Sequence, residues 1–427
     1  MSEWVHSTVG AVTVYQRAGG TPPSTVERYY GGDIRFVTIE DITSSGRFLA
    51  RTDRSLTEEG LRFSAAWLLK DPHILYSMYA TVGKPIINRI PCATNQAIIA
   101  LKPSDAIDAE FLYYQLLFIR PDVYKYTAQT TQSNLNAGAV KKLPISYPKN
   151  KREQRKIAAV LASLDTAIET TEALIEKHQQ IKAGLTHDLF TRGVLPNGQL
   201  RPPWEQAPEL YRQTPLGWLP SDWGPSNCGR AFTIDSGITL GPHRWPRKHA
   251  HPYIRVANLH RDEIRMDDVA TLEALPSDAD RVLKRFDLLV VEGHANTAEI
   301  GRCAMVDGNA EGLLFQNHLF RLRALETQAA FALLWLNSHH VQRYWGRACA
   351  TSSGLNTINR TMLKAAPFYV PSDAEQSRIT DAVSSSRRQI RAQSTKLEKL
   401  RAQKLGLMQD LLTGKVSVKR ACTEVPA

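Results

Sequence analysis

The feature that most constrains the fold of this chain is a long helical segment that occurs twice. Residues 153–194 align with residues 375–416 at a fixed offset of 222 (375 − 153) without a gap, and 14 of the 42 aligned positions are identical. A repeat of roughly 220 residues is too long for a solenoid, whose units have about 20–50 residues. The pattern therefore predicts a duplicated module, in which a globular region precedes a long helix in each copy.

Apolar residues recur in both copies at alternating steps of four and three, which is the a/d pattern of a coiled coil. No proline interrupts either copy, so we expect two helices of about 40 residues, each roughly 60 Å long. One such helix with a single apolar stripe is unstable alone in water, and the other copy is the available partner. We predict an antiparallel pair with pseudo-twofold symmetry, with polar layers at Thr171/Gln393 and Lys182/Lys404. The predicted helix-pair interface consists of Ile157, Leu161, Leu164, Ile168, Ile175, Leu185, Leu189, Ile379, Val383, Ile390, Leu397, Leu400, Leu407 and Leu411.

The regions before the two helices have an α+β pattern. Short apolar runs between turn residues predict strands, and denser apolar stretches predict helices. The first region has no clear copy of the strand and glycine turn at 287–293, and its segment at 76–85 is a looser match. The expected strands lie at 34–39, 96–101, 253–256 and 287–291, and the expected helices at 109–118 and 328–337.

These patterns predict six segments along the chain. Two globular domains are followed by two long helices, and a Pro- and Trp-rich connector joins the halves. The predicted bounds are 1–150 for the first globular domain, 151–192 for the first helix, 193–222 for the connector, 223–372 for the second globular domain, 373–413 for the second helix and 414–427 for a tail.

Composition narrows the class of protein and of partner. The net charge of +11 and the pI near 9.4 favour an anionic partner, most commonly nucleic acid. There is no apolar run of about 18 residues and no signal-peptide pattern at the first residues, so we expect no membrane span. The five cysteines are scattered without a CxxC pair, which indicates free thiols in a reducing cytoplasm.

Motifs for catalysis were sought and not found in the sequence. There is no GxxxxGK[ST] phosphate loop, no Asn-Pro-Pro-aromatic methyltransferase motif and no HExxH or EF-hand pattern. The pair His339-His340 is interpreted as a helix end, not as a metal site. We therefore expect a chain without catalytic residues and without a metal.

Several motifs, in their order along the chain, carry a resemblance to one family. They are the duplicated Glu-Gln…Ile helix start, Gly19–Ser24, Leu216–Pro220, Phe315–Leu319, Asp188–Thr191 and Asp410–Thr413. With these motifs the chain resembles the specificity subunit of a Type I restriction–modification system over nearly its whole length. The resemblance implies two target-recognition domains, which each read one half of a split site in double-stranded DNA.

The same resemblance implies roles for the helices and for partner subunits. The helices would set the distance between half-sites and dock two methyltransferase subunits, together with restriction/translocase subunits. S-adenosylmethionine, ATP and magnesium would belong to those partners, with no cofactor in this chain.

Candidate DNA-reading residues are polar or basic side chains beside predicted strands. Arg and Lys suit guanine, Asn and Gln suit adenine, and hydroxyl and basic groups suit phosphates. In the first domain the candidates are Thr38, Asp41, Ser44, Ser45, Arg47, Gln132, Ser133 and Asn134. In the second domain they are Arg244, Arg247, Lys248, Arg255, Asn258, His260, Arg261, His294, Asn296, Ser352 and Asn356.

Two other functional classes compete with DNA recognition. One is a coiled-coil scaffold for proteins, without sequence-specific DNA binding; the basic charge and the divergence of the two globular domains speak against it. The other is a fragment of a fused restriction–methylation enzyme, which the missing methyltransferase motif disfavours.

Overall fold

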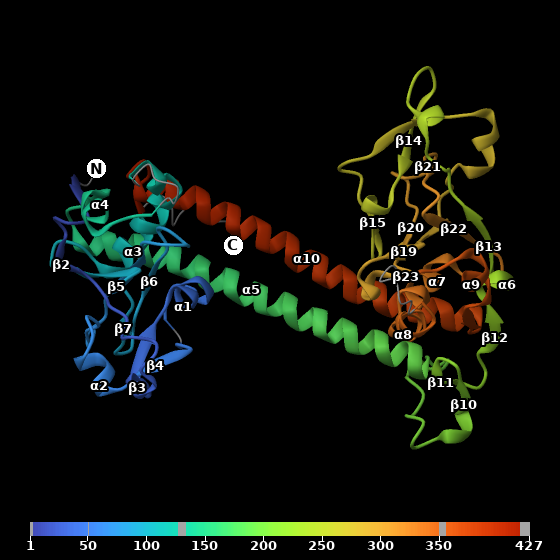
Figure 1. Cartoon of the computed structure of the whole chain (residues 1–427), viewed down its shortest axis with the longest axis horizontal. Coiled ribbons are helices and arrows are strands. Elements are labelled where there is room, and N and C mark those ends of the chain that lie inside the picture. The colour runs from blue at the N-terminus through green and yellow to red at the C-terminus, as the bar shows by residue number, and fades with distance from the viewer. Residues whose placement is uncertain (1–2, 50, 127–133, 350–355, 419–427) are drawn as a thin grey trace. The chain divides into compact units, whose positions relative to one another are not determined.

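The computed structural model describes residues 3–49, 51–126, 134–349 and 356–418. These residues form two compact units: unit 1 comprises Met1–Ala173 and Ser394–Ala427, and unit 2 comprises Leu174–Gln393. The helices α5 (Lys151–Arg192) and α10 (Asp373–Leu412) each begin in one unit and end in the other (Figure 1). Each unit therefore consists of one globular region and half of each long helix.

The globular part of unit 1 contains three small sheets. Their strand orders are β2-β8-β5-β6, β4-β3-β7 and β1-β9. The strands are β1 (Trp4–Thr8), β2 (Thr13–Ala18), β3 (Tyr30–Val37), β4 (Arg54–Leu56), β5 (Ile74–Ser77), β6 (Pro85–Ile87), β7 (Ala93–Thr94), β8 (Ile98–Pro103) and β9 (Pro144–Pro148). The short helices are η1 (Glu27–Tyr29), α1 (Ile39–Ser44), α2 (Glu58–Arg62), α3 (Ala109–Ile119), η2 (Arg120–Tyr126) and α4 (Ala137–Lys142).

Unit 2 has sheets of the same design. Their orders are β13-β22-β18-β20, β17-β14-β21 and β12-β24, with the added pairs β10-β11, β15-β16 and β19-β23. The strands are β10 (Tyr211–Thr214), β11 (Gly217–Pro220), β12 (Gly224–Asn227), β13 (Phe232–Ser236), β14 (Ala250–Ile254), β15 (Leu259–His260), β16 (Glu263–Ile264), β17 (Ala270–Glu273), β18 (Leu288–Val291), β19 (Gly293–His294), β20 (Cys303–Met305), β21 (Leu314–Phe315), β22 (Leu319–Ala324), β23 (Asn356–Thr357) and β24 (Pro367–Val370). The helices are η3 (Pro208–Leu210), α6 (Cys228–Ala231), η4 (Pro242–Arg244), η5 (Val256–Asn258), η6 (Pro276–Arg281), η7 (Thr297–Glu299), α7 (Ala329–Leu336), α8 (His339–Ala348) and α9 (Arg360–Ala365).

The matching strand orders confirm the α+β fold and correct one expectation. β5 occupies in unit 1 the place that β18 occupies in unit 2. β5 pairs with β8, the strand before α3, and β18 pairs with β22, the strand before α7. The first unit therefore contains a copy of this strand, which overlaps the looser match at 76–85. Its sequence, Ile74-Leu75-Tyr76-Ser77, is fully buried but ends in a hydroxyl residue instead of a second valine, which hid the match.

The long helices pack against each other and against the globular cores as an antiparallel pair. In unit 1, Ile157 and Leu161 of α5 share a hydrophobic core with Leu411 of α10. In unit 2, Leu189 of α5 shares a core with Ile379 and Val383 of α10. The start of each helix thus meets the end of the other within one core, which only antiparallel helices allow.

Along the predicted seam, burial is greatest near the ends of the helices and lower in their middle. Ile157, Leu161, Leu189, Ile379, Val383 and Leu411 are fully buried. The other eight predicted positions are partly buried, and none of the fourteen is exposed. The globular regions cover the helix ends, while the middle stretch relies on the partner helix alone.

The glutamine shared by both helix starts anchors each helix to its own globular region. Gln154 accepts a hydrogen bond from the Asp108 amide (2.7 Å) and donates to the Pro148 carbonyl (2.9 Å). Gln376 accepts from the Gln328 amide (2.8 Å) and donates to the Pro371 carbonyl (3.0 Å). Both side chains are completely buried, so each helix start is fixed to the helix and strand that precede it.

The connector is non-helical and packs onto unit 2. Leu216, Leu219 and Trp223 are buried in its core, and Trp204 stacks on Trp218 at 5.1 Å between ring centroids. At the end of α5, Gly193 adopts φ +64°, and a Cβ there would lie 2.3 Å from both Arg201 and Glu375. Only glycine satisfies this close approach.

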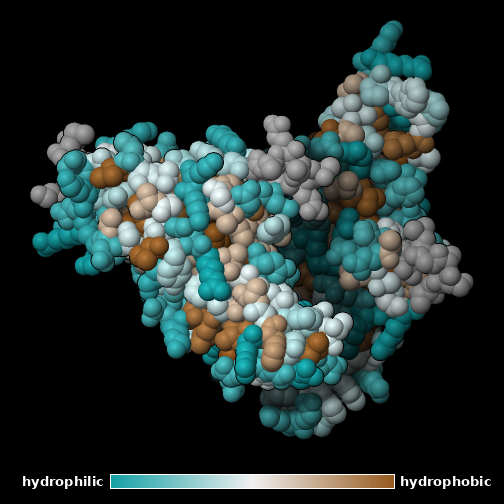
Figure 2. All heavy atoms as spheres, turned by 60° about the vertical axis from the view of Figure 1, so that its left-hand side comes forward, coloured by the Kyte–Doolittle hydropathy of each residue, from teal (hydrophilic) through white to brown (hydrophobic). Residues whose placement is uncertain are grey.

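The surface is largely hydrophilic on the face shown in Figure 2. Hydrophobic residues occur there in small groups between hydrophilic ones. Among the described residues, no helix has the length and hydropathy of a membrane span.

Candidate nucleic-acid interface

Two predicted contacts, Asp41 and Asn258, are buried and serve as helix caps in equivalent places of the two units. The Asp41 carboxylate accepts hydrogen bonds from the Thr38 amide (2.7 Å) and hydroxyl (2.9 Å). The Asn258 side chain accepts a hydrogen bond from the backbone amide of Arg255 (3.0 Å) and donates to two backbone carbonyls. With exposures of 4% and 3%, neither side chain lies at the surface as folded. A base contact by Asp41 or Asn258 would require the cap to open.

A basic loop of unit 2 projects from a buried ion pair. Arg244 donates to both carboxylate oxygens of Asp278, and both side chains are at most 10% exposed. Although burial opposes it, the hydrogen bond from Arg244 holds the pKa of Asp278 below its usual value. The predicted contact Arg244 is thus occupied in fixing the loop.

The rest of this loop is exposed. Arg247 and Lys248 are exposed, and Trp245 is 69% exposed. The Glu273 carboxylate accepts hydrogen bonds from the amides of Arg247 (2.7 Å) and His249 (3.1 Å). The backbone is therefore held while the two cations and the indole ring point outward, which suits phosphate contacts and base stacking.

Backbone pairing brings together candidates that are more than 60 residues apart in the sequence. β19 and β23 pair so that His294 lies opposite Asn356. Asn296 is exposed and its side chain accepts a hydrogen bond from the Ala298 amide (3.0 Å). His260 is partly exposed on β15, and Arg255 donates to the Asp268 carboxylate at 2.8 Å. Within the described residues, the backbone pairs His294 with Asn356, and the Asn296 amide donates to the His294 ring (3.0 Å); Ser352 lies outside the described residues.

In unit 1 the candidates follow α1. Ser44 is exposed and donates to the Glu40 carbonyl (2.9 Å), and Ser45 is partly exposed. Thr38 is nearly buried in its cap. Asn134 is partly exposed, while Gln132 and Ser133 lie outside the described residues.

Arg47 belongs to a polar network that links the unit 1 loop to both long helices. Its guanidinium donates to the Tyr114 hydroxyl (3.1 Å), and Tyr114 donates to the Asp165 carboxylate of α5 (2.6 Å). Asp165 also pairs with Lys404 of α10 at 2.5 Å. Burial, and then the hydrogen bond to Asp165, raise the pKa of Tyr114, so its hydroxyl stays protonated as the donor. We name these four residues the unit 1 cluster.

An equivalent cluster in unit 2 is built from different residues. Arg261 donates to Asn337 (3.1 Å), Asn337 donates to Asp262 (2.8 Å), and Asp262 pairs with Arg387 of α10 (2.6 Å). Lys182 of α5 lies beside them and has its pKa lowered by burial and by Arg387. We name these five residues the unit 2 cluster.

Sequence reasoning did not connect Arg261 with the other residues of unit 2 that line the same cavity. Asp262, Ser338 and Lys182 come from three distant segments, and only the fold brings them to one cavity. The offset of 222 was the available signal. It aligns Asp165 with Arg387 and Lys182 with Lys404, so the carboxylate of the first helix copy corresponds to a cation in the second.

The two adjacent histidines lie at the start of α8. Burial, and then the neighbouring groups His340, His187 and Arg343, lower the pKa of His339 to about 3. Burial also lowers the pKa of His340 to about 4, and its ring lies 2.9 Å from the Leu216 carbonyl. Both rings are therefore neutral and packed. Within the part of the chain that the structure describes, no group of three or more His, Cys, Asp or Glu side chains could hold a metal.

Comparisons with known proteins agree with this geometry. The domain described as "Type I restriction modification DNA specificity domain" matches residues 1–180. The MjaIX specificity subunit of Methanocaldococcus jannaschii is 27% identical over 249 residues, which cover 57% of this chain and 55% of the relative. This chain spans less than two thirds of the length of the curated relatives that it matches first.

Solved structures show the same fold over the whole chain. The S subunit from M. genitalium superposes with a TM-score of 0.55 at 15% identity, covering 96% of both chains. A chain from a study of complex assembly and conformational transition in the type I R-M system gives a TM-score of 0.60 at 15% identity, covering 96% of this chain and 97% of that one. Residues 1–180 thus match the Type I specificity-domain family, and the duplicated units and paired long helices form the same fold as the S subunit from M. genitalium.

Proposed function

We propose that this chain is the DNA-recognition subunit of a Type I restriction–modification complex and reads a bipartite site, one half with each unit. The observation that carries the proposal is the repetition of one scaffold with different loops. The strand orders of three sheets correspond between the two units, whereas the exposed loops that follow the strands differ in length and charge. A shared scaffold with divergent loops suits two readers of different sequences.

In unit 2, the contacts to DNA would come from the exposed loop and the strand pair described above. Arg247 and Lys248 would hold phosphates, and His294 and Asn296 would approach base edges. Arg244, Arg255 and Asn258 would act indirectly, because their polar groups are used to hold loops in place. In unit 1, Ser44 and Ser45 would face the DNA.

The long helices would couple the two readers and receive the catalytic partners. α5 and α10 run without interruption from one unit into the other, so helix length would set the gap between half-sites. Exposed charges on both helices, such as Glu169, Glu176 and Arg391, offer docking points for two methyltransferase subunits and for restriction/translocase subunits. Those partners would carry S-adenosylmethionine, ATP and magnesium, this chain would have no catalytic role, and the complex would act in the cytoplasm.

The test is a methylation map. We expect that co-expression with a methyltransferase subunit of the same system directs adenine methylation to one motif of two short half-sites with a fixed gap. Single-molecule sequencing of the host genome reads this directly. Methylation without a bipartite motif would contradict the proposal and favour a scaffold without sequence-specific binding.

A further inference from the structure

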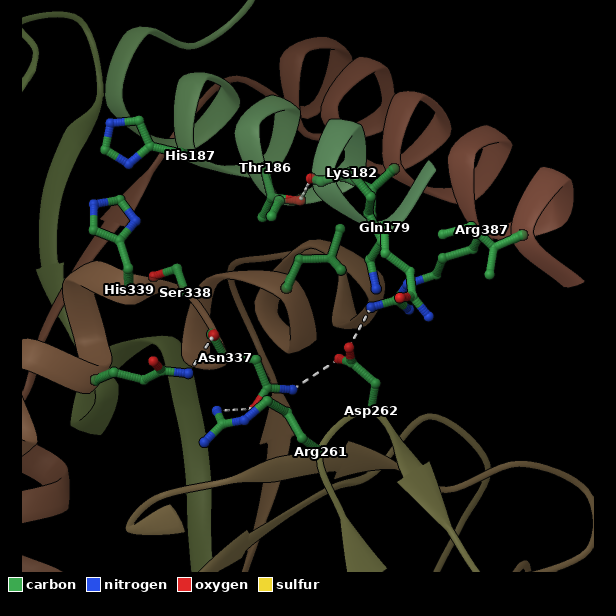
Figure 3. A pocket seen from close by; sticks show the side chains of 15 residues that line it. Gln179, Lys182, Thr186, His187, Arg261, Asp262, Asn337, Ser338, His339 and Arg387 are labelled. Carbon is green, nitrogen blue, oxygen red and sulfur yellow. Dashed lines mark hydrogen bonds and ion pairs between the residues drawn. The ribbon is translucent and has the colours of Figure 1, made fainter. Parts of the chain in front are cut away.

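The unit 2 cluster borders a cavity of ≈460 Å³ that carries excess positive charge (Figure 3). Lys182, Arg261 and Arg387 line it, and Asp262 is the carboxylate among its lining residues. These four side chains sum to a charge of +2 (3 − 1). A concave site with this balance attracts anions.

The three cations differ in how far they are already paired. Arg387 binds Asp262 at 2.6 Å, and Arg261 donates to Asn337 and to the Ala298 carbonyl (2.7 Å). The Lys182 ammonium forms no hydrogen bond or ion pair with any described residue, although it is partly buried. Burial disfavours its charge and lowers its pKa, and an anion in the cavity would restore the lost interaction.

A helix N-terminus opens onto the same cavity. Ser338 is the N-cap residue of the ten-residue helix α8 and is 2% exposed. Its hydroxyl does not cap the helix and has no partner among the described residues, and Ser338 lies beside His339 among the residues that line the cavity (Figure 3). A buried hydroxyl is normally satisfied, and amides at a helix start carry partial positive charge.

We propose that this cavity binds a phosphate group. The Lys182 ammonium, the Ser338 hydroxyl and the first amides of α8 are donors of the kind that hold phosphate at helix N-termini. The phosphate comes either from the DNA backbone or from a free phosphate compound. The first source rests on the proposed function, whereas the site itself rests on the geometry of unit 2 alone.

The first experiment needs no DNA. Thermal unfolding of the full chain is followed in sodium phosphate and in sodium chloride at equal ionic strength. We expect phosphate to raise the unfolding temperature of the wild type, and Lys182→Gln and Ser338→Ala to weaken the apparent phosphate affinity about tenfold each. Lys177→Gln removes a charge from an exposed position of the same helix and should leave the phosphate effect unchanged.

Both variants should fold, because one removes an unpaired buried charge and the other an unpaired buried hydroxyl. Absence of a phosphate-specific shift in the wild type overturns the proposal. An equal phosphate effect in the wild type, Lys182→Gln and Lys177→Gln overturns it as well.

A second arm identifies the source of the phosphate. The salt dependence of duplex binding is compared for Lys182→Gln and Lys177→Gln. A slope reduced by about 1 only in Lys182→Gln assigns the site to a DNA phosphate. Equal slopes together with phosphate-specific stabilisation assign it to a free phosphate compound. If the wild type binds no DNA, the proposed function fails while the phosphate result stands.

Discussion

The two units place charged groups at equivalent positions of the helix pair but balance them in opposite ways. In unit 1 the repeat positions hold Asp165 and Lys404, which pair directly at 2.5 Å. In unit 2 the same positions hold Arg387 and Lys182, two cations, so the charge must be balanced from elsewhere. The globular region supplies Asp262 for Arg387, and Lys182 remains beside a cavity.

The difference shows how a duplicated fold can diverge without losing its architecture. The apolar seam and the buried glutamines Gln154 and Gln376 are kept, because a helix without its partner and anchor does not fold. The charged cluster lies between the helices and the globular region, where an opposite-charge pair contributes little net stability. The residues of the charged cluster can therefore change without loss of the fold. In unit 2 the replacement of a carboxylate by Arg387 leaves a site that attracts anions.

The largest expected effect concerns a buried ion pair of unit 2. Glu375 accepts hydrogen bonds from Arg201 (2.6 Å) and from the Val194 amide (2.7 Å), and both charged side chains are at most 5% exposed. Glu375→Ala leaves the buried Arg201 with only the exposed Asp222 as a charged partner. We therefore expect the free energy of unfolding of unit 2 to fall by roughly 3–5 kcal/mol.

Hydrogen exchange of peptides from each unit measures this effect locally. Exposed Asp381 lies on the same helix in unit 2, and Asp381→Ala serves as the matched control with a near-zero effect. Equal losses of protection in Glu375→Ala and Asp381→Ala would contradict the assignment.

The next effect separates the units by pH. His339 and His340 have lowered pKa values in the folded chain, about 3 and about 4, so the unfolded chain binds protons more readily. Stability of unit 2 is therefore complete above about pH 6.5 and falls as the pH drops below it, by roughly 2 kcal/mol for each histidine at pH 5. The groups that face them are His187 and Arg343, both of which oppose added positive charge.

Unfolding at pH 7 and pH 5 tests this difference. Unit 1 also holds a histidine with a lowered pKa, His73. Unit 1 should lose less stability at pH 5 than unit 2, because it has one such histidine and unit 2 has two. His339→Phe keeps an aromatic ring without the titration and should flatten the pH dependence of unit 2. An unchanged pH dependence in this variant would refute the role of His339.

A smaller effect compares the two seam lysines directly. Lys404→Met removes the partner of Asp165, whose side chain is 12% exposed, and should destabilise unit 1 by about 1–3 kcal/mol. Lys182→Met removes a desolvated ammonium without an ion pair and should be neutral or stabilising in unit 2. Denaturant unfolding in the absence of phosphate measures the change in unfolding free energy of each variant. Changes of the same sign and size in both variants would contradict the difference between the two clusters.

The smallest effect concerns the exposed loop of unit 2. Arg247→Ala and Lys248→Ala should each reduce the slope of log affinity for DNA against log salt by about 1, with stability unchanged. Arg388→Ala, an exposed arginine on α10, is the control. Slopes equal to the wild type in both loop variants would remove this loop from the DNA contacts.

Much of the fold followed from sequence periodicity. The heptad pattern located the helix pair, and apolar runs located strands β3, β8, β14 and β18, because burial and secondary structure impose local periods. The candidate site followed less well. Asp41, Asn258 and Arg244 share residue type and neighbourhood with the exposed candidates, yet their side chains cap helices or pair with a buried carboxylate.

The unit 2 cavity lay beyond sequence reasoning for a related reason. Its polar groups come from α5, from the loop after β15, from the start of α8 and from α10, and no local pattern connects these segments. Whether a lysine is paired or left alone is decided by which residue the fold places opposite it.

The central claim is that each unit reads one half-site and that the continuous helices set the gap. It is tested most directly by methylation mapping after insertion of one heptad into both α5 and α10, after Ala173 and after Gln393, where the sequence of each helix passes from one unit to the other. Seven residues lengthen a helix by about 10 Å, which corresponds to about three base pairs. The account predicts the same two half-sites with a correspondingly longer gap; altered half-sites, or an unchanged gap, would contradict it.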